Sequence, residues 1–172
     1  MAENIQDKVE GEIIDWIALG SGGRLVAFKP VKGADLVVQK KGEYPAKEIS
    51  LNLEIFLAPI EGKNFKKDIL QSALNQTKNF FLIFLVFDEV KQKINDKIWL
   101  VPTSDFEKNA EKVKLEDGSI ILKFHESLTT DPKSLFSKYL LDKKDFINLL
   151  IKNLILENKP KAKSGFKRKI YQ

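Results

Sequence analysis

A run of eight apolar residues, Phe80–Phe87 (FFLIFLVF), constrains the fold more than any other stretch of the chain. Its side chains lack the apolar–polar alternation of a strand with one wet face, and the run is too short for a membrane-spanning helix, which needs roughly 20 residues. The run therefore predicts a central β-strand that is covered on both faces. A chain with such a strand needs a sheet with other elements packed on each side.

Composition excludes several classes of chemistry. The chain has 172 residues, no cysteine and one histidine, His125. Thiolate zinc sites, disulfides and cysteine nucleophiles are therefore excluded, and neither a histidine-based metal site nor a Ser-His-Asp triad is expected. Any chemistry must come from carboxylates, lysines and hydroxyls. The net charge of +5 permits contact with nucleic acid, but a lysine-rich solubilising surface is the simpler explanation.

Hydrophobic periodicity predicts the elements of the first third of the chain. Residues 4–19 carry apolar side chains at helical spacing, and the glycines of GSGG end that pattern. Short strands follow at RLVAFKP and ADLVVQK, and a third strand begins at ISLNLEIF and runs to about Pro59. The loop between the last two strands is short enough for a hairpin.

The patterns in the rest of the chain predict further helices and strands. The expected strands are 79–88, 97–102 and 118–124. The expected helices are 64–77, a helix with Thr103 or Ser104 as its N-cap, and two apolar stripes at 135–140 and 146–154 with Asp142 as a cap between them.

This order of elements predicts one α/β domain, residues 1–157, with a central mixed β-sheet flanked by an N-terminal helix and C-terminal helices. Residues 158–172 are expected to form a basic, flexible tail, which either solubilises the protein or contacts phosphates without sequence preference. The candidate nucleic-acid contacts in this tail are Lys159, Lys161, Lys163, Lys167, Arg168 and Lys169. The polar N-terminus is unlike a signal peptide, so we expect a cytoplasmic protein with no membrane partner.

Acidic residues occur in an order that suggests a metal site. Glu12 lies on the predicted first helix, and Asp35 begins the second strand. Asn52 and Glu54 occupy alternate positions on the third strand, so both side chains leave the same face. If the two strands pair, Asp35 approaches that face and the helix brings Glu12 above it. Three converging carboxylates, those of Glu12, Asp35 and Glu54, would suit Mg²⁺, which could activate water and neutralise a phosphoryl oxygen.

Ordinary structural roles explain the same residues. Asn52 and Glu54 fit the solvated face of an amphipathic strand, and an acid after Gly-Ala is often a turn residue. Glu12 competes with Glu10 and Asp15 for the role of the helix carboxylate.

The chain resembles the restriction-endonuclease-like PD-(D/E)XK superfamily over about residues 10–155. GRLVAFKPVKGADLVV is similar to the family segment that leads from the first helix into the strand with the metal-binding Asp. ISLNLE is similar to the strand that usually ends in Glu-X-Lys or Gln-X-Lys. The resemblance implies that Glu12 is the helix carboxylate and Asp35 the principal metal ligand. Asn52 then stands where the family has Glu or Gln, and Glu54 stands where it has the catalytic lysine.

Glu54 departs most from the family pattern, because it places a negative charge where a lysine would stabilise the phosphate. The first expectation is therefore a nuclease-like protein with a degenerate or remodelled active site, which binds nucleic acid or a partner protein without efficient cleavage. The second is an active Mg²⁺-dependent DNA endonuclease with a lysine recruited from elsewhere. The third is an assembly subunit without nucleic-acid contact, in which the apolar strand and the C-terminal helices support a homo-oligomer. The lysines considered for recruitment are Lys29, Lys40 and Lys41.

Overall fold

The computed structural model describes residues 4–42, 50–59, 64–75, 77, 79–88, 90–129 and 133–156. Its helices are α1 (Ile5–Gly20), α2 (Thr103–Asn109) and α3 (Lys143–Ile151). Its strands are β1 (Leu25–Phe28), β2 (Leu36–Lys40), β3 (Leu51–Pro59), β4 (Asn64–Leu70), β5 (Phe80–Asp88), β6 (Lys93–Pro102), β7 (Glu111–Lys114), β8 (Ile120–Ser127) and β9 (Leu140–Asp142). Short helical turns lie at η1 (Gln71–Ala73), η2 (Ser137–Tyr139) and η3 (Lys152–Leu156).

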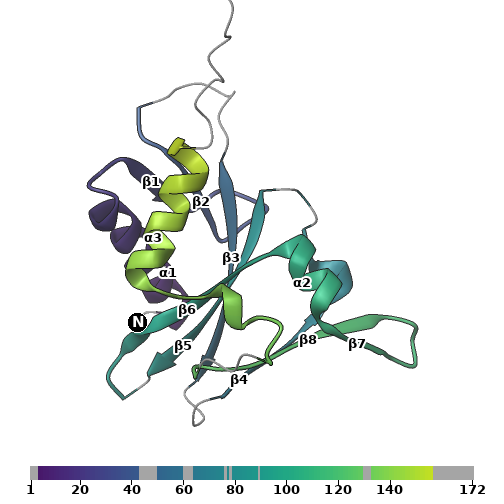
Figure 1. Cartoon of the computed structure of the whole chain (residues 1–172). Coiled ribbons are helices and arrows are strands. Elements are labelled where there is room, and N and C mark those ends of the chain that lie inside the picture. Colours follow the sequence, from purple (N-terminus) through teal and green to yellow (C-terminus); the bar gives the residue numbers. More distant parts are fainter. Residues whose placement is uncertain are drawn as a thin grey trace, which may run out of the picture.

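The strands form two sheets, and the predicted α/β domain with a mixed sheet is confirmed (Figure 1). The larger sheet has six strands in the order β1-β2-β3-β5-β6-β9, and the smaller has three in the order β4-β8-β7. Strands β3 and β5 pair in parallel, whereas the other neighbours in the larger sheet pair antiparallel. The connection from β3 to β5 runs through β4 and η1, so it places β4 in the smaller sheet.

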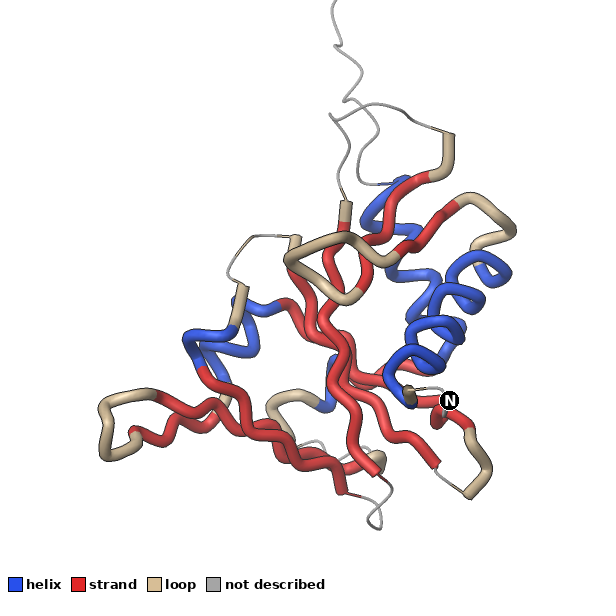
Figure 2. The backbone as a smooth tube through the Cα atoms, turned by 180° about the vertical axis from the view of Figure 1, so that it is seen from behind, coloured by secondary structure: helices blue, strands red, loops and turns tan. Residues whose placement is uncertain are grey.

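Strand β5 is the buried central strand that the apolar run predicted. It lies between β3 and β6, and its side chains alternate between two cores. Ile83, Leu85 and Phe87 join a core with α1 and α3, whereas Leu82, Phe84 and Val86 join a core with the smaller sheet. Figure 2 shows the two long helices on one side of the larger sheet and the smaller sheet on the other. Both faces of the central strand are therefore covered, for the reason that its sequence indicated.

Helix α1 forms where the helical spacing predicted it. The Asn4 side chain caps its start by accepting a hydrogen bond from the Gln6 amide at 3.2 Å. The helix ends at Gly20, where a β-carbon would lie 2.9 Å from Cγ1 of Ile147 on α3. Glycine at this position therefore lets α3 pack closely against the end of α1.

The helix predicted at 64–77 is wrong, because residues Asn64–Leu70 form strand β4. Phe65 and Ile69 are both buried, and a spacing of four residues fits one face of a helix as well as one face of a strand. Antiparallel pairing with β8 selects the strand over the helix, since Phe65 lies opposite Glu126 and Ile69 opposite Leu122.

Two predictions in the second half of the chain are also wrong. The stripe at 135–140 forms η2 and the start of β9, because the free edge of β6 pairs with residues Leu140–Asp142. The N-cap position of α2 is Pro102, and the Thr103 hydroxyl instead donates to the Phe80 carbonyl at 3.1 Å. By contrast, the Asp142 cap is confirmed, since its carboxylate accepts from the Asp145 amide at 2.8 Å.

The predicted pairing of the second and third strands is confirmed, although their connecting residues 43–49 lie outside the described part of the chain. Within the described residues, no helix combines the length and apolarity needed to span a bilayer.

Candidate functional site

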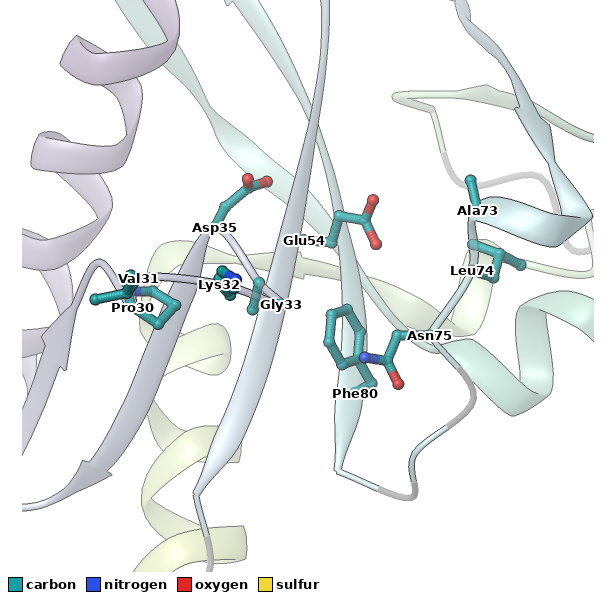
Figure 3. A pocket seen from close by; sticks show the side chains of 11 residues that line it. Pro30, Val31, Lys32, Gly33, Asp35, Glu54, Ala73, Leu74, Asn75 and Phe80 are labelled. Carbon is teal, nitrogen blue, oxygen red and sulfur yellow. The ribbon is translucent and has the colours of Figure 1, made fainter.

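A cavity of about 790 Å³ opens between the β1–β2 loop, β3 and the start of β5. Its walls are the β1–β2 loop from Pro30 to Asp35, Glu54 on β3, the segment Ala73–Asn75 after η1, and Phe80 at the start of β5 (Figure 3). The sequence predicted that Asp35 and Glu54 belong to one site, and both residues line the wall of this pocket.

Strand register explains why these two residues are neighbours. Leu36 pairs with Leu53, so Asp35 falls opposite Glu54 one position beyond the end of the β2 ladder. The Asp35 amide donates to the Leu53 carbonyl at 3.0 Å. The Asp35 carboxylate accepts from the Ile55 amide, with Oδ2 at 2.7 Å from the nitrogen. Since β2 begins at Leu36, this side chain supplies the hydrogen-bond partner that a longer strand would have given Ile55.

The two carboxylates point in different directions. In Figure 3 the Asp35 carboxylate is directed toward β3, whereas the Glu54 carboxylate is directed toward Ala73 and Leu74. Asp35 uses one oxygen as a strand-end acceptor, and Glu54 projects into the pocket. Asp35 therefore has a structural role in addition to any chemical role.

Both acids bind their protons more tightly than in water. Burial is the main cause of the raised pKa of Asp35, and the hydrogen bond from Ile55 acts in the opposite direction. The charge of Glu10 raises the Asp35 pKa further, whereas Lys29 lowers it. Burial also raises the pKa of Glu54, and the charge of Asp35 adds to that rise. A cation bound between them would offset both effects.

The carboxylate of α1 that acts on Asp35 belongs to Glu10 rather than to Glu12. Glu10 is only 6% exposed, and its Oε2 lies 2.5 Å from the Lys29 Nζ. The same ammonium lies 2.6 Å from Asp7 Oδ1, and these bonds raise the pKa of Lys29 to about 12. Glu12 is half-buried on the helix and does not line the pocket. Across the described ranges, no group of three or more His, Asp or Glu side chains is placed to hold a metal ion.

Asn52 shares the Glu54 face, as the alternation predicted, but it does not line the pocket. It is half-buried beside Phe80, its partner on β5. The lysines considered for recruitment are not in the pocket wall either, and Lys29 is engaged by the acids of α1. Lys32, which sequence reasoning did not single out, does line the pocket. Only the path of the β1–β2 loop brings it there, so no local pattern could have identified it.

Two further sequence expectations concern surfaces. The basic tail candidates, from Lys159 to Lys169, lie outside the described residues. The apolar run of β5 is at most 3% exposed at Phe80 and at each residue from Leu82 to Phe87. These side chains therefore lie in the interior of the protein, and the homo-oligomer stays a prediction.

Neither the known protein families nor the curated proteins that we compared include a match to this chain. The resemblance to the PD-(D/E)XK superfamily therefore stays a prediction from the sequence.

Proposed function

We propose that this chain is a nuclease-like protein whose pocket binds a divalent cation through Asp35 and Glu54, and which holds nucleic acid there without efficient cleavage. The observation that carries the proposal is that two half-buried acids, Glu54 on β3 and Asp35 directly before β2, line the wall of one cavity. Each carboxylate is less stable when ionised than it would be in water. A bound cation would stabilise both ionised forms, so the site gains from binding one.

Two carboxylates are enough for Mg²⁺, which is usually held by one or two of them together with waters and phosphate oxygens. Asp35 would contribute the oxygen that does not accept from Ile55, and Glu54 its carboxylate. When bound, such an ion neutralises phosphate charge and lowers the pKa of a coordinated water. The chain's own groups would bind and orient the phosphate beside it.

The position of Asp35 opposite Glu54 favours an alignment with the family pattern that is shifted by two residues from the one given above. Glu54 takes the acid position of (D/E)-X-K, because it is the residue that faces Asp35 across the hairpin. Phe56, two residues further on the same face, then stands at the lysine position. Its ring stacks on Phe84 with 5.3 Å between the ring centroids, so it supplies no charge. Inefficient cleavage is then expected because of Phe56 rather than because of Glu54.

Two ammonium groups favour the second candidate, an active Mg²⁺-dependent endonuclease. Lys32 lines the pocket, and the Lys67 Nζ lies 6.0 Å from the centre of the Phe56 ring. Either group would supply a cation on the face that carries Glu54.

Titration calorimetry with Mg²⁺ and Mn²⁺ tests the proposal. We expect binding by the wild type, at least tenfold weaker binding by Asp35→Asn and by Glu54→Gln, and unchanged binding by the control Glu12→Gln, because Glu12 lies outside the pocket. If the wild type binds neither ion, or if the Glu12 variant loses binding with the others, the cation site is wrong.

Plasmid DNA incubated with either ion separates the two candidates. The first predicts that the DNA is retained at low salt and left intact. Nicking that disappears in Asp35→Asn would instead establish the active enzyme.

A further inference from the structure

A row of side chains crosses four strands of the larger sheet and ends at the pocket. Phe28 on β1 pairs with Val37 on β2, Val37 pairs with Asn52 on β3, and Asn52 pairs with Phe80 on β5. Directly paired residues project from the same face of a sheet. Phe28 therefore lies on the face that carries Glu54, two strands away from Asn52, which corresponds to about 10 Å.

In the part of the chain that the structure describes, this face is open at β1 and β2. The opposite face is covered by α1 and α3, which pack on Leu25, Leu36 and their neighbours. Within the described part of the chain, neither core includes the three side chains of the open strip, which we define as Val26, Phe28 and Val37. Phe28 is 40% exposed, and Val31, at the tip of the loop that lines the pocket, is 98% exposed. A partly exposed aromatic residue thus lies on the edge strand of the sheet.

The hairpin that carries this strip is strongly basic. Residues 24–42 contain five basic side chains and one acid, Asp35. The backbone bond from the Lys41 amide to the Arg24 carbonyl, at 2.9 Å, extends the β1–β2 ladder by one pair, and strand alternation places this pair on the face of Phe28. The Arg24 Nε donates to the Ser21 carbonyl at 2.8 Å, and the residue is exposed. Lys32 stands at the other end, in the pocket wall. Cations therefore flank the open strip at both ends.

We propose that the β1–β2 hairpin binds single-stranded nucleic acid, with an unpaired base stacked on the Phe28 ring and phosphates held by Arg24, Lys32 and Lys41. The inference rests on the proposed function and names its substrate class. An exposed ring among cations is the arrangement with which proteins hold unpaired strands, because every base offers a face for stacking. In a duplex the bases are stacked on one another and cannot cover the ring. The row from Phe28 to Asn52 would lead such a strand to the Asp35–Glu54 pocket.

Fluorescence anisotropy with a labelled 20-nucleotide oligo(dT), and with a duplex of the same length, tests this inference in the presence of Mg²⁺. Phe28→Ala should weaken oligo(dT) binding by about 5- to 150-fold, the range that loss of one stacking aromatic produces. Phe28→Tyr should retain the affinity, because its ring stacks equally well. Leu135→Ala is the matched control, since it shortens an exposed apolar side chain (61% exposed) outside this face. Thermal melting of each variant establishes that it is folded.

The results of this experiment distinguish failure of the hairpin inference from failure of the proposed function. If the wild type holds oligo(dT) and Phe28→Ala holds it equally well, the hairpin inference is wrong while the proposed function stands. If Phe28→Ala weakens duplex binding by the same factor, the preference for single strands is wrong. A glutamate-rich peptide that competes with the oligonucleotide, and that also depends on Phe28, would make the hairpin a site for acidic proteins instead. If the wild type holds no nucleic acid at all, the proposed function itself fails.

Discussion

The hydrogen bond from the Ile55 amide to Asp35 predicts different stabilities for two substitutions at the same position. Strand β2 begins at Leu36, so the carboxylate is the acceptor that the half-buried end of the ladder requires. Asp35→Ala removes that acceptor and leaves the Ile55 N–H without its partner. Asp35→Asn removes the charge but keeps an oxygen in the same place.

The expected magnitude follows from the geometry of this bond. The nitrogen and Oδ2 are 2.7 Å apart, the distance of a strong, charge-assisted bond. Leaving such a donor unpaired costs about 1–3 kcal/mol, and the site is only half-buried, so about 2 kcal/mol is expected for Asp35→Ala. Asp35→Asn should cost less than about 1 kcal/mol, because its amide oxygen accepts and because loss of the charge removes the burial penalty and the repulsion from Glu54.

Urea unfolding at pH 7, followed by circular dichroism, measures both values. For a chain of 172 residues, a loss of about 2 kcal/mol corresponds to a melting temperature lower by roughly 4–8 °C, which thermal scans can check. If Asp35→Ala unfolds within about 0.5 kcal/mol of the wild type, or if both variants lose equal stability, the strand-end role of the carboxylate is refuted.

Two further substitutions test other parts of the structure. The raised pKa of Glu54 means that ionisation of its carboxyl opposes folding. The stability that the protonated carboxyl provides is therefore complete below its ordinary pKa of 4.5, and it is lost as the pH rises through the higher folded-state pKa. Glu54→Gln should therefore gain stability relative to the wild type between pH 4 and pH 7, and parallel denaturation curves over that range would contradict this. Ser21→Ala should cost about 1–3 kcal/mol, because the fully buried Ser21 hydroxyl accepts from the Leu25 amide at 3.0 Å. Chemical denaturation measures that loss, and a variant as stable as the wild type would disprove it.

The elements that the sequence predicted correctly are those with an unambiguous pattern. Helix α1 repeats its apolar residues over four turns and is closed by glycines, and β5 is apolar at every position from Phe80 to Phe87. Strand β4 could not be recognised, because Phe65 and Ile69 satisfy both periods and the pairing with β8 decides between them. Strand β9 could not be recognised either, because residues Leu140–Asp142 form a strand through their pairing with the edge of β6.

Some residues of the candidate site could also be predicted from the sequence, whereas others could not. Asp35 and Glu54 could be selected from the sequence, since Asp35 directly precedes one strand and Glu54 lies on the next, and the pairing of these strands was predicted. The choice between Glu10 and Glu12 could not be made, because it depends on how α1 is rotated against the sheet. Lys32 reaches the pocket through a loop, which has no period to follow.

The sequence by itself determined the central buried strand, the first helix, the three strands that follow it and the face to which Asn52 and Glu54 belong. These properties depend on the spacing of apolar side chains along a few consecutive residues, and that spacing can be recognised without knowing their neighbours. Tertiary structure decided the second sheet, the burial of Glu10, the position of Lys32 and the row that joins Phe28 to the pocket. Each of those depends on contacts between segments far apart in the chain, where register and packing select among patterns that are locally equivalent.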